Sequence, residues 1–291
     1  MIKKIIKSVL GERISFSLYN FLQFLKMRFF NAELYNNVKN NKKFCGIHTG
    51  KRCFILGNGP SLKNVDLEIL KDEYVFTVNC FSRVKGFEKV NSNYHLWIDS
   101  SFFELRDDQK YNHDDLIEDY YKISKTNAVC FVPSIAFNFI KKNNLDKILD
   151  FHYLLLGQDS VNNPKIEYDL SKFITGYTNV VQYAISIAIY MGFSEIYLLG
   201  CDSTGVMSLL NTAMNLSNSD VHAYDKDDVD ERNKQILSKW TMTDVFYDQY
   251  LLFHGYRVLE QITVKKGIKL INCSDSTLIN EIPRKKISEI L

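Results

Sequence analysis

Short apolar runs alternate with longer stretches of helical periodicity along most of the chain. The short runs, bounded by glycine, asparagine, proline or charged residues, predict strands at Cys53–Leu56, Tyr74–Val78, Tyr94–Ile98, Ala128–Val132, Glu195–Leu199 and Ile268–Asn272, and one within Lys147–Leu156. Helices are predicted at Leu62–Leu70, Asn179–Met191 and Val245–Lys265. Buried strands between helices are typical of an α/β fold. We therefore expect a Rossmann-like, mostly parallel, doubly wound sheet with helices on both faces.

Small and polar residues gather where the predicted strands end. Gly57, Asn58 and Gly59 follow the first strand, Asn79 follows the second, and Asp99 follows the third. The strand at Glu195–Leu199 ends in Gly200-Cys201-Asp202. Ligands of open parallel sheets bind at the carboxyl ends of the strands. These residues are therefore the predicted ligand site.

The turn Gly57-Asn58-Gly59-Pro60-Ser61 joins a strand to a helix-like segment. Glycines let the backbone approach a ligand closely, and Ser61 is a candidate helix N-cap, with free amides beyond it that would favour an anion. The turn is neither G-x-G-x-x-G nor a P-loop, since Leu62 stands where a glycine is needed. It predicts phosphate or nucleotide binding; the alternative is an ordinary strand-to-helix turn.

Other polar residues have two interpretations each. Asn79, Asp99 and Thr175, the last followed by Gly176, can bond a nucleotide or sugar, or can cap the element that follows. Asp202 suits a ribose hydroxyl or a cytosine amino group.

The polar stretch at about 203–240 predicts a lid over the site. In it His222 is a candidate general base, and Tyr224 can hydrogen-bond a departing phosphate; a surface loop is the alternative. His254, on a predicted helix, is the second candidate base. Asp228-Val229-Asp230 has the form of a metal-binding D-x-D motif, but its charge run favours a solvated face, and no metal is expected.

Composition and charge define the broad class. The chain has 291 residues, 46% hydrophobic and 24% charged, which is a globular composition, and its net charge of +2 does not indicate nucleic-acid binding. Six cysteines without C-x-x-C spacing predict reduced thiols in a cytoplasmic protein. A homo-oligomer is compatible with the sequence.

The N-terminal region differs from the rest in charge. Residues 1–51 hold ten lysines and arginines against Glu12 and Glu33, and the opening apolar positions have helical spacing without a run long enough to span a membrane. We expect a basic amphipathic helical segment and a polar connector over 1–50, and a catalytic domain over 51–291. The helix either lies on the inner membrane, making the protein peripheral to it, or packs on the domain with its lysines in water.

The stretches "FILGNGPSL" and "GFSEIYLLGCD", in this order and with Asn79 and "FITGYTN" between them, resemble the family 42 bacterial sialyltransferases and the related MptE-like proteins. The resemblance implies a Rossmann-like domain in its GT-A-like variant, with a lid. It implies transfer of a sialic-acid-type sugar from a CMP donor, without a metal or a further cofactor. It also assigns donor contacts to Asn58, Gly59, Ser61, Asn79, Thr175, Gly176 and Asp202.

The leading hypothesis is an inverting glycosyltransferase that builds a bacterial surface glycan from a nucleotide-activated, CMP-linked sugar. Its partners would be that donor and an oligosaccharide or lipid-linked acceptor. Two positions depart from the resembled pattern: Phe173 replaces an arginine, and Gly176 replaces a serine. Two alternatives stay open: an MptE-like diphosphokinase that uses ATP and magnesium, and a non-catalytic assembly protein.

Overall fold

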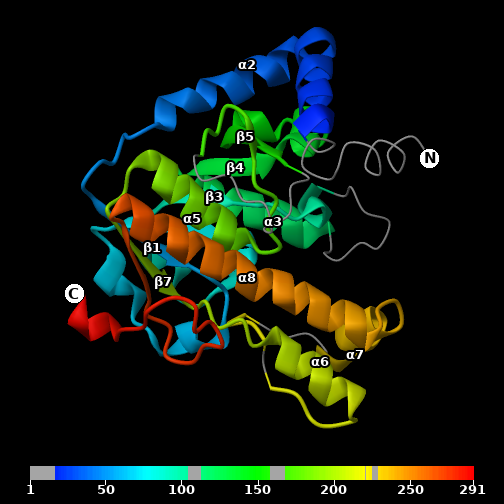
Figure 1. The fold of residues 1–291 in the computed structure, drawn as a ribbon, viewed down its shortest axis with the longest axis vertical. Helices are drawn as coiled ribbons and strands as arrows, with labels where there is room; N and C mark the ends of the chain where they lie inside the picture. Colours follow the sequence, from blue (N-terminus) through cyan, green and yellow to red (C-terminus); the bar gives the residue numbers. More distant parts are fainter. Residues whose placement is uncertain (1–16, 104–112, 158–167, 220, 225–228) are drawn as a thin grey trace.

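One parallel sheet organises the computed structural model, which describes residues 17–103, 113–157, 168–219, 221–224 and 229–291. Its eight strands in these residues have the order β6-β5-β4-β3-β2-β1-β7-β8, and every neighbouring pair is parallel. The strands are β1 (Arg52–Leu56), β2 (Tyr74–Val78), β3 (Ser92–Leu96), β4 (Val129–Pro133), β5 (Asp150–Leu156), β6 (Phe173–Ile174), β7 (Glu195–Leu199) and β8 (Lys269–Asn272). The predicted Rossmann-like α/β fold is confirmed (Figure 1).

Helices cover both faces of this sheet (Figure 1). They are a helix at residues 17–30, α2 (Ala32–Asn40), α3 (His113–Ser124), α4 (Phe137–Lys142), α5 (Val180–Met191), α6 (Gly205–Ala213), α7 (Val229–Leu237) and α8 (Met242–Lys266). No helix in the described residues has the length and apolarity to cross a bilayer. None of the six cysteines, all within the described residues, forms a disulfide, and Cys45 alone is exposed.

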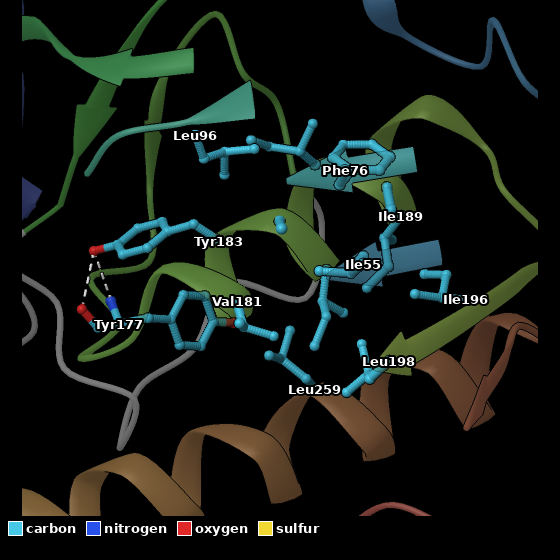
Figure 2. Close-up of a cluster of buried hydrophobic side chains, with 14 of the residues drawn as sticks. Ile55, Phe76, Leu96, Tyr177, Val181, Tyr183, Ile189, Ile196, Leu198 and Leu259 are labelled. Atoms are coloured by element: carbon cyan, nitrogen blue, oxygen red, sulfur yellow. Dashed lines mark hydrogen bonds between the residues drawn. The ribbon is translucent and has the colours of Figure 1, made fainter. Parts of the chain in front are cut away.

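Helices α5 and α8 build the core on one face of the sheet. Alternate residues of the central strands, such as Ile55 and Ile196, point toward Val181 and Ile189 of α5 and Leu259 of α8 (Figure 2). An Asn179–Gln182 capping box begins α5, and Gly192, with φ 84°, ends it. A side chain at Gly255 would place its Cβ 2.4 Å from Gln182 Nε2, so this glycine allows α8 to pack closely on α5.

The opposite face is covered by the N-terminal helices and by α3 and α4. Met27 of the 17–30 helix and Leu34 and Val38 of α2 join Cys130 and Tyr153 of the sheet in one buried cluster. Burial of these side chains fixes the N-terminal helices on β4 and β5.

The stretch predicted to be a polar connector is therefore part of the domain. Within 31–50, α2 is followed by a 3₁₀ turn at Asn41–Phe44. The Asn41 amide donates to the carbonyls of Tyr153 (2.8 Å) and Leu170 (3.1 Å). Its polar sequence misled the prediction because a fully buried asparagine here satisfies two backbone carbonyls, one within β5 and one before β6.

One further local prediction was wrong. The predicted Leu62–Leu70 helix is two 3₁₀ turns, Pro60–Asn64 and Leu67–Leu70, separated by Val65 and Asp66. The stretch at about 203–240, predicted to be a lid, contains α6 and α7, whose facing polar side chains bond: Asn233 donates to Thr212 at 3.0 Å, and also to Ser208. Residue 220 and residues 225–228, with Asp228 of the D-x-D motif, lie outside the described residues.

Candidate functional site

The chain reverses its direction across the sheet between β1 and β7. From β1 it adds β2 to β6 on one side, and then crosses through α5 to place β7 and β8 on the other side. Doubly wound sheets bind ligands outside the carboxyl ends of the strands at such a switch point. Here those ends are the Gly57–Ser61 turn and Gly200–Asp202, two of the segments predicted from the sequence.

Glycines allow the two segments to touch. A Cβ at Gly57 would lie 2.3 Å from the carbonyl oxygen of Gly200, and a Cβ at Gly59 would lie 2.5 Å from Cγ of Asp202. Neither position tolerates a side chain without movement of the backbone or of a buried carboxylate. The glycines of the turn are therefore required by strand-end packing.

Asp202, which follows β7, is connected to the Gly57–Ser61 turn by hydrogen bonds from Ser61. One carboxylate oxygen accepts from the Ser61 N–H at 2.7 Å, and the other accepts from the Ser61 hydroxyl. Asp202 is buried, and this burial raises the pKa of its carboxyl group, while the two bonds from Ser61 oppose the increase. In this structure Asp202 braces the turn.

The hydrogen bonds of the turn connect it to the end of β7. Gly57 N–H donates to Leu199 O (2.8 Å), Gly59 N–H donates to Gly200 O (2.7 Å), and Ser61 N–H is bound to Asp202. One prediction is corrected here: Ser61 does not cap the following 3₁₀ turn, which has Gly59 at its N-cap and Pro60 at its start.

Two asparagines at neighbouring strand ends have unsatisfied acceptors. Among the described residues, Asn58 Oδ1 and Asn79 Oδ1 are buried without a hydrogen-bond partner. The two side chains belong to one arrangement, because Asn58 Nδ2 donates to the carbonyl of Val78 at 3.0 Å. Asn79 has φ 51°, a left-handed conformation that asparagine tolerates better than most residues. Buried amide oxygens without partners indicate positions that a hydroxyl or amino group of a ligand could satisfy.

A buried histidine that the sequence analysis missed supports Asn79. His95 Nδ1 lies 2.7 Å from the Thr77 hydroxyl, which itself lies 2.7 Å from the Ser92 hydroxyl. Burial lowers the pKa of His95 to about 3, and its contact with the Asn79 backbone acts in the opposite direction. A polar residue inside the apolar "YHLW" run was the signal that could have found it.

The structure brings one candidate base to this site. Ala223 N–H donates to the carbonyl of Asn58 at 2.8 Å, so the segment 221–224 runs beside the turn. The rings of His222 and Tyr224 are stacked, with centroids 5.1 Å apart. Tyr224 also packs against the hydrophobic clusters of the sheet.

The second candidate base lies on α8. The His254 ring stacks on Tyr250 at 5.4 Å between centroids, and Tyr250 stacks on Tyr247 at 6.3 Å. Tyr247 and Tyr250 are exposed, and His254 is half-buried. Gly255, the residue after His254, is the point where α8 contacts α5.

The remaining predicted residues have local partners. Asp99 accepts from the Ser101 N–H at 3.0 Å, and so begins the 3₁₀ turn Ser100–Phe103. Thr175 is buried just after β6, and Gly176 is half-buried next to it. Asn179 is the N-cap of α5, which leaves Thr175 without that role.

No group of histidine, cysteine or acidic side chains suited to a metal occurs in the described part of the chain. A groove of about 480 Å³ lies at the amino end of β5, lined by residues that include Glu33, Lys141, Asp146 and Tyr153. Lys141 pairs there with Glu33 (2.6 Å) and Asp146 (2.7 Å), and the groove contains none of the predicted site residues. The candidate site is therefore placed at the switch point.

The doubly wound parallel sheet, with polar residues at its switch point, makes this a Rossmann-like α/β protein. The family model described as 6-hydroxymethylpterin diphosphokinase MptE-like matches residues 30–204, more than half of the chain. The chain therefore belongs to the MptE-like family, as the sequence motifs predicted. No curated protein matches it.

Solved structures with a similar arrangement include two sialyltransferases from Campylobacter jejuni. CstII, in complex with a substrate analogue, cytidine-5′-monophosphate, is 20% identical, with 81% of this chain and 85% of that chain covered and a TM-score of 0.42. Cst-I, a monofunctional alpha-2,3-sialyltransferase, is 19% identical, with 81% and 80% covered and a TM-score of 0.46. The MAf glycosyltransferase from Magnetospirillum magneticum AMB-1 is 12% identical, with 87% and 38% covered and a TM-score of 0.46.

Proposed function

We propose that the protein is an inverting glycosyltransferase that takes a sugar of sialic-acid type from a CMP donor and builds a bacterial surface glycan without a metal. The observation that carries the proposal is the pair of buried, unpartnered oxygens on Asn58 and Asn79, together with the hydrogen bond that joins the segment of His222 and Tyr224 to the Asn58 carbonyl. Amide oxygens accept hydrogen bonds from hydroxyl and amino groups, which ribose and cytosine carry.

Charge at the site supports a donor of low charge. The turn Gly57–Ser61, Asn79, Gly200–Asp202 and residues 221–224 include His222 but no lysine or arginine. A CMP donor of a sialic-acid-type sugar has one negative charge on its phosphodiester and one on the sugar carboxylate, whereas the triphosphate of ATP has more and normally requires cations. The residue types at the switch point therefore favour the CMP-sugar.

The residues have distinct roles in the proposed reaction. Asn58 and Asn79 would orient the nucleotide, while Asp202, through Ser61, would hold the turn in place. Thr175 and Gly176 would contact the donor from the segment between β6 and α5. Tyr224 would donate a hydrogen bond to the departing phosphate, and His222 would remove the proton of the acceptor hydroxyl.

Access to the site requires movement of the segment 221–224. Both amide oxygens are shielded from solvent, and Ala223 is bonded to Asn58. A nucleotide would displace this segment on entry, and the segment would then close on the donor. The region at about 203–240 would thus act as the predicted lid, excluding water from the transferred sugar.

The MptE-like family description supports a second candidate, a diphosphokinase that uses ATP and magnesium. Thermal unfolding of the purified chain with CMP, UDP, GDP and ATP, each with and without magnesium, separates the candidates. We expect a CMP-dependent increase in melting temperature that does not need magnesium. An increase with ATP that needs magnesium would instead assign the diphosphokinase, and no increase with any nucleotide would favour a non-catalytic assembly protein.

A further inference from the structure

The helix at residues 17–30 has two opposite apolar faces. Met27 and Asn20 are buried against the domain, and Phe24 packs on the same cluster. The opposite face is apolar and largely open to solvent. It consists of Leu18, Phe21, Leu22, Leu25 and Phe29, here called the outer stripe.

The outer stripe is contiguous and exposed. At about 100° per residue its five members fall within about 60° of the position of Leu18, roughly opposite Met27. Phe21 is 56% exposed, Leu22 53% and Phe29 74%. Packing in the described part of the domain explains the inner face of the helix and leaves the outer stripe unexplained.

Basic residues border the outer stripe on both sides. Lys26 and Arg28 are exposed and fall about 80° to either side of its centre on the same helical wheel. Residues 1–51 hold ten basic residues against two acidic ones, a charge of +8, while the remaining 240 residues, with 26 basic and 32 acidic, have a charge of −6. An apolar stripe between two basic borders fits an anionic lipid surface, which takes the apolar side chains and pairs its phosphates with the cations. A second copy of the helix would instead bring like charges together.

The position of the helix relates the outer stripe to the candidate site. Asn20 lies next to Gly157, at the carboxyl end of β5, where a Cβ would be 3.7 Å from Asn20 Nδ2. The strand ends that carry Asn58 and Asn79 belong to the same edge of the sheet. In Figure 1 the 17–30 helix, in dark blue, lies toward the same edge of the sheet, at the right of the view, as α6, α7 and the amino half of α8.

We infer that the 17–30 helix binds the surface of an anionic membrane through the outer stripe, lying in the plane of the interface. Lys26 and Arg28 contact lipid phosphates, and the carboxyl edge of the sheet is held next to the bilayer. The binding surface is independent of the chemistry at the switch point. The further consequence, that the acceptor is anchored in the membrane, rests on the proposed function.

Vesicle co-sedimentation of the full chain tests this inference. Wild type is compared on vesicles of phosphatidylglycerol and phosphatidylcholine and on vesicles of phosphatidylcholine alone. The test variant is Leu22→Gln with Phe29→Gln. Its matched control is Ile135→Gln with Val264→Gln, two residues that are 61% and 65% exposed on other elements. Thermal unfolding without lipid verifies that both variants are folded.

We expect wild type to bind the anionic vesicles and to be released by salt. The outer-stripe variant should bind the anionic vesicles at least about tenfold more weakly than wild type. The control variant should bind like wild type. Lys26→Gln with Arg28→Gln should weaken binding to anionic vesicles only. Wild type that does not bind anionic vesicles would overturn the inference, as would equal binding by the outer-stripe variant.

A different outcome would assign the outer stripe to a second copy of the chain. This is a dimer in sedimentation velocity that the same substitutions dissociate, without vesicle binding. Nucleotide-induced stabilisation is measured separately, so failure of either proposal can be distinguished.

Discussion

Asp202 accepts hydrogen bonds from both the backbone N–H and the hydroxyl of Ser61, a residue 141 positions earlier in the chain. The pair bridges β7 and β1, the two strands between which the sheet changes direction. Because the carboxylate is buried, its two bonds fix the Gly57–Ser61 turn on the β7 end. The shape of the candidate site therefore depends on this pair.

Removal of the Ser61 hydroxyl should destabilise the protein. Ser61→Ala leaves a buried carboxylate with one bond fewer, and we expect a loss of about 1–3 kcal/mol in the free energy of unfolding. Ser194→Ala is the control, since the exposed Ser194 hydroxyl donates only to Lys51 O at 3.2 Å and should change stability by less than about 0.5 kcal/mol. Chemical denaturation measures both; equal values would contradict the bracing role.

A methyl group at Gly59 should disrupt the switch point. Its Cβ would lie 2.5 Å from Cγ of Asp202, so we expect Gly59→Ala to cost about 2 kcal/mol or more and to abolish stabilisation by CMP. At Gly205 the nearest atom to an added Cβ is 3.6 Å away, so Gly205→Ala is a matched substitution that fits. Thermal unfolding with and without CMP compares the two. A Gly59→Ala protein of wild-type stability would show that the close approach is not needed.

A substitution at Asn79 should change ligand binding while changing stability little. Asn79→Gly keeps the φ of 51° without strain, so stability should stay within about 1 kcal/mol of wild type, while the amide that orients the nucleotide is lost. Asn144, with φ 54° near α4, supplies the same backbone change away from the site as Asn144→Gly. Calorimetric titration with CMP should give weaker binding for Asn79→Gly only. Equal affinities in the two variants would remove Asn79 from the site.

Turnover should distinguish the two candidate bases. His222 lies in the segment bonded to Asn58, so His222→Ala should lower kcat about 100-fold or more, the usual loss for a general base. His254→Ala removes a ring stacked on Tyr250 and should retain most of the activity. Release of CMP from a CMP-sugar in the presence of acceptor measures both. A large loss of kcat in His254→Ala alone would identify His254 as the general base. Full activity in both variants would reject the mechanism.

Stability should fall as pH decreases from 7 because of His95. Its pKa in the folded protein is about 3, below the value of about 6.5 in an unfolded chain, so only the unfolded state takes up a proton between these values. The free energy of unfolding therefore rises with pH across this window, and His95 alone should remove about 2 kcal/mol between pH 7 and pH 5. Denaturation at both pH values measures the loss. His95→Gln should reduce the difference, whereas His254→Gln, the control, should retain it.

Several elements could be predicted because their signals are local. The strands at Tyr74–Val78 and Glu195–Leu199 match the structure at both ends, and the helix predicted at Asn179–Met191 ends in the structure at Met191. Strand β6, only Phe173–Ile174, could not be predicted because two residues have no measurable periodicity. The helix of the supposed connector was missed because its buried Asn41 satisfies carbonyls far away in the sequence.

The sequence by itself determined which residues stand at strand ends, since apolar runs and the polar residues that interrupt them are local features. Tertiary structure alone decided which of those residues meet. The order of the strands places β7 beside β1, and this neighbourhood directed the amides of Gly57, Gly59 and Ser61 to the β7 end. The same packing bonded the segment that contains His222 to Asn58, whereas His254 lies on α8 and stacks on Tyr250. Strand pairing between distant segments depends on the crossover through α5 and on the burial of its apolar faces, which no local pattern specifies.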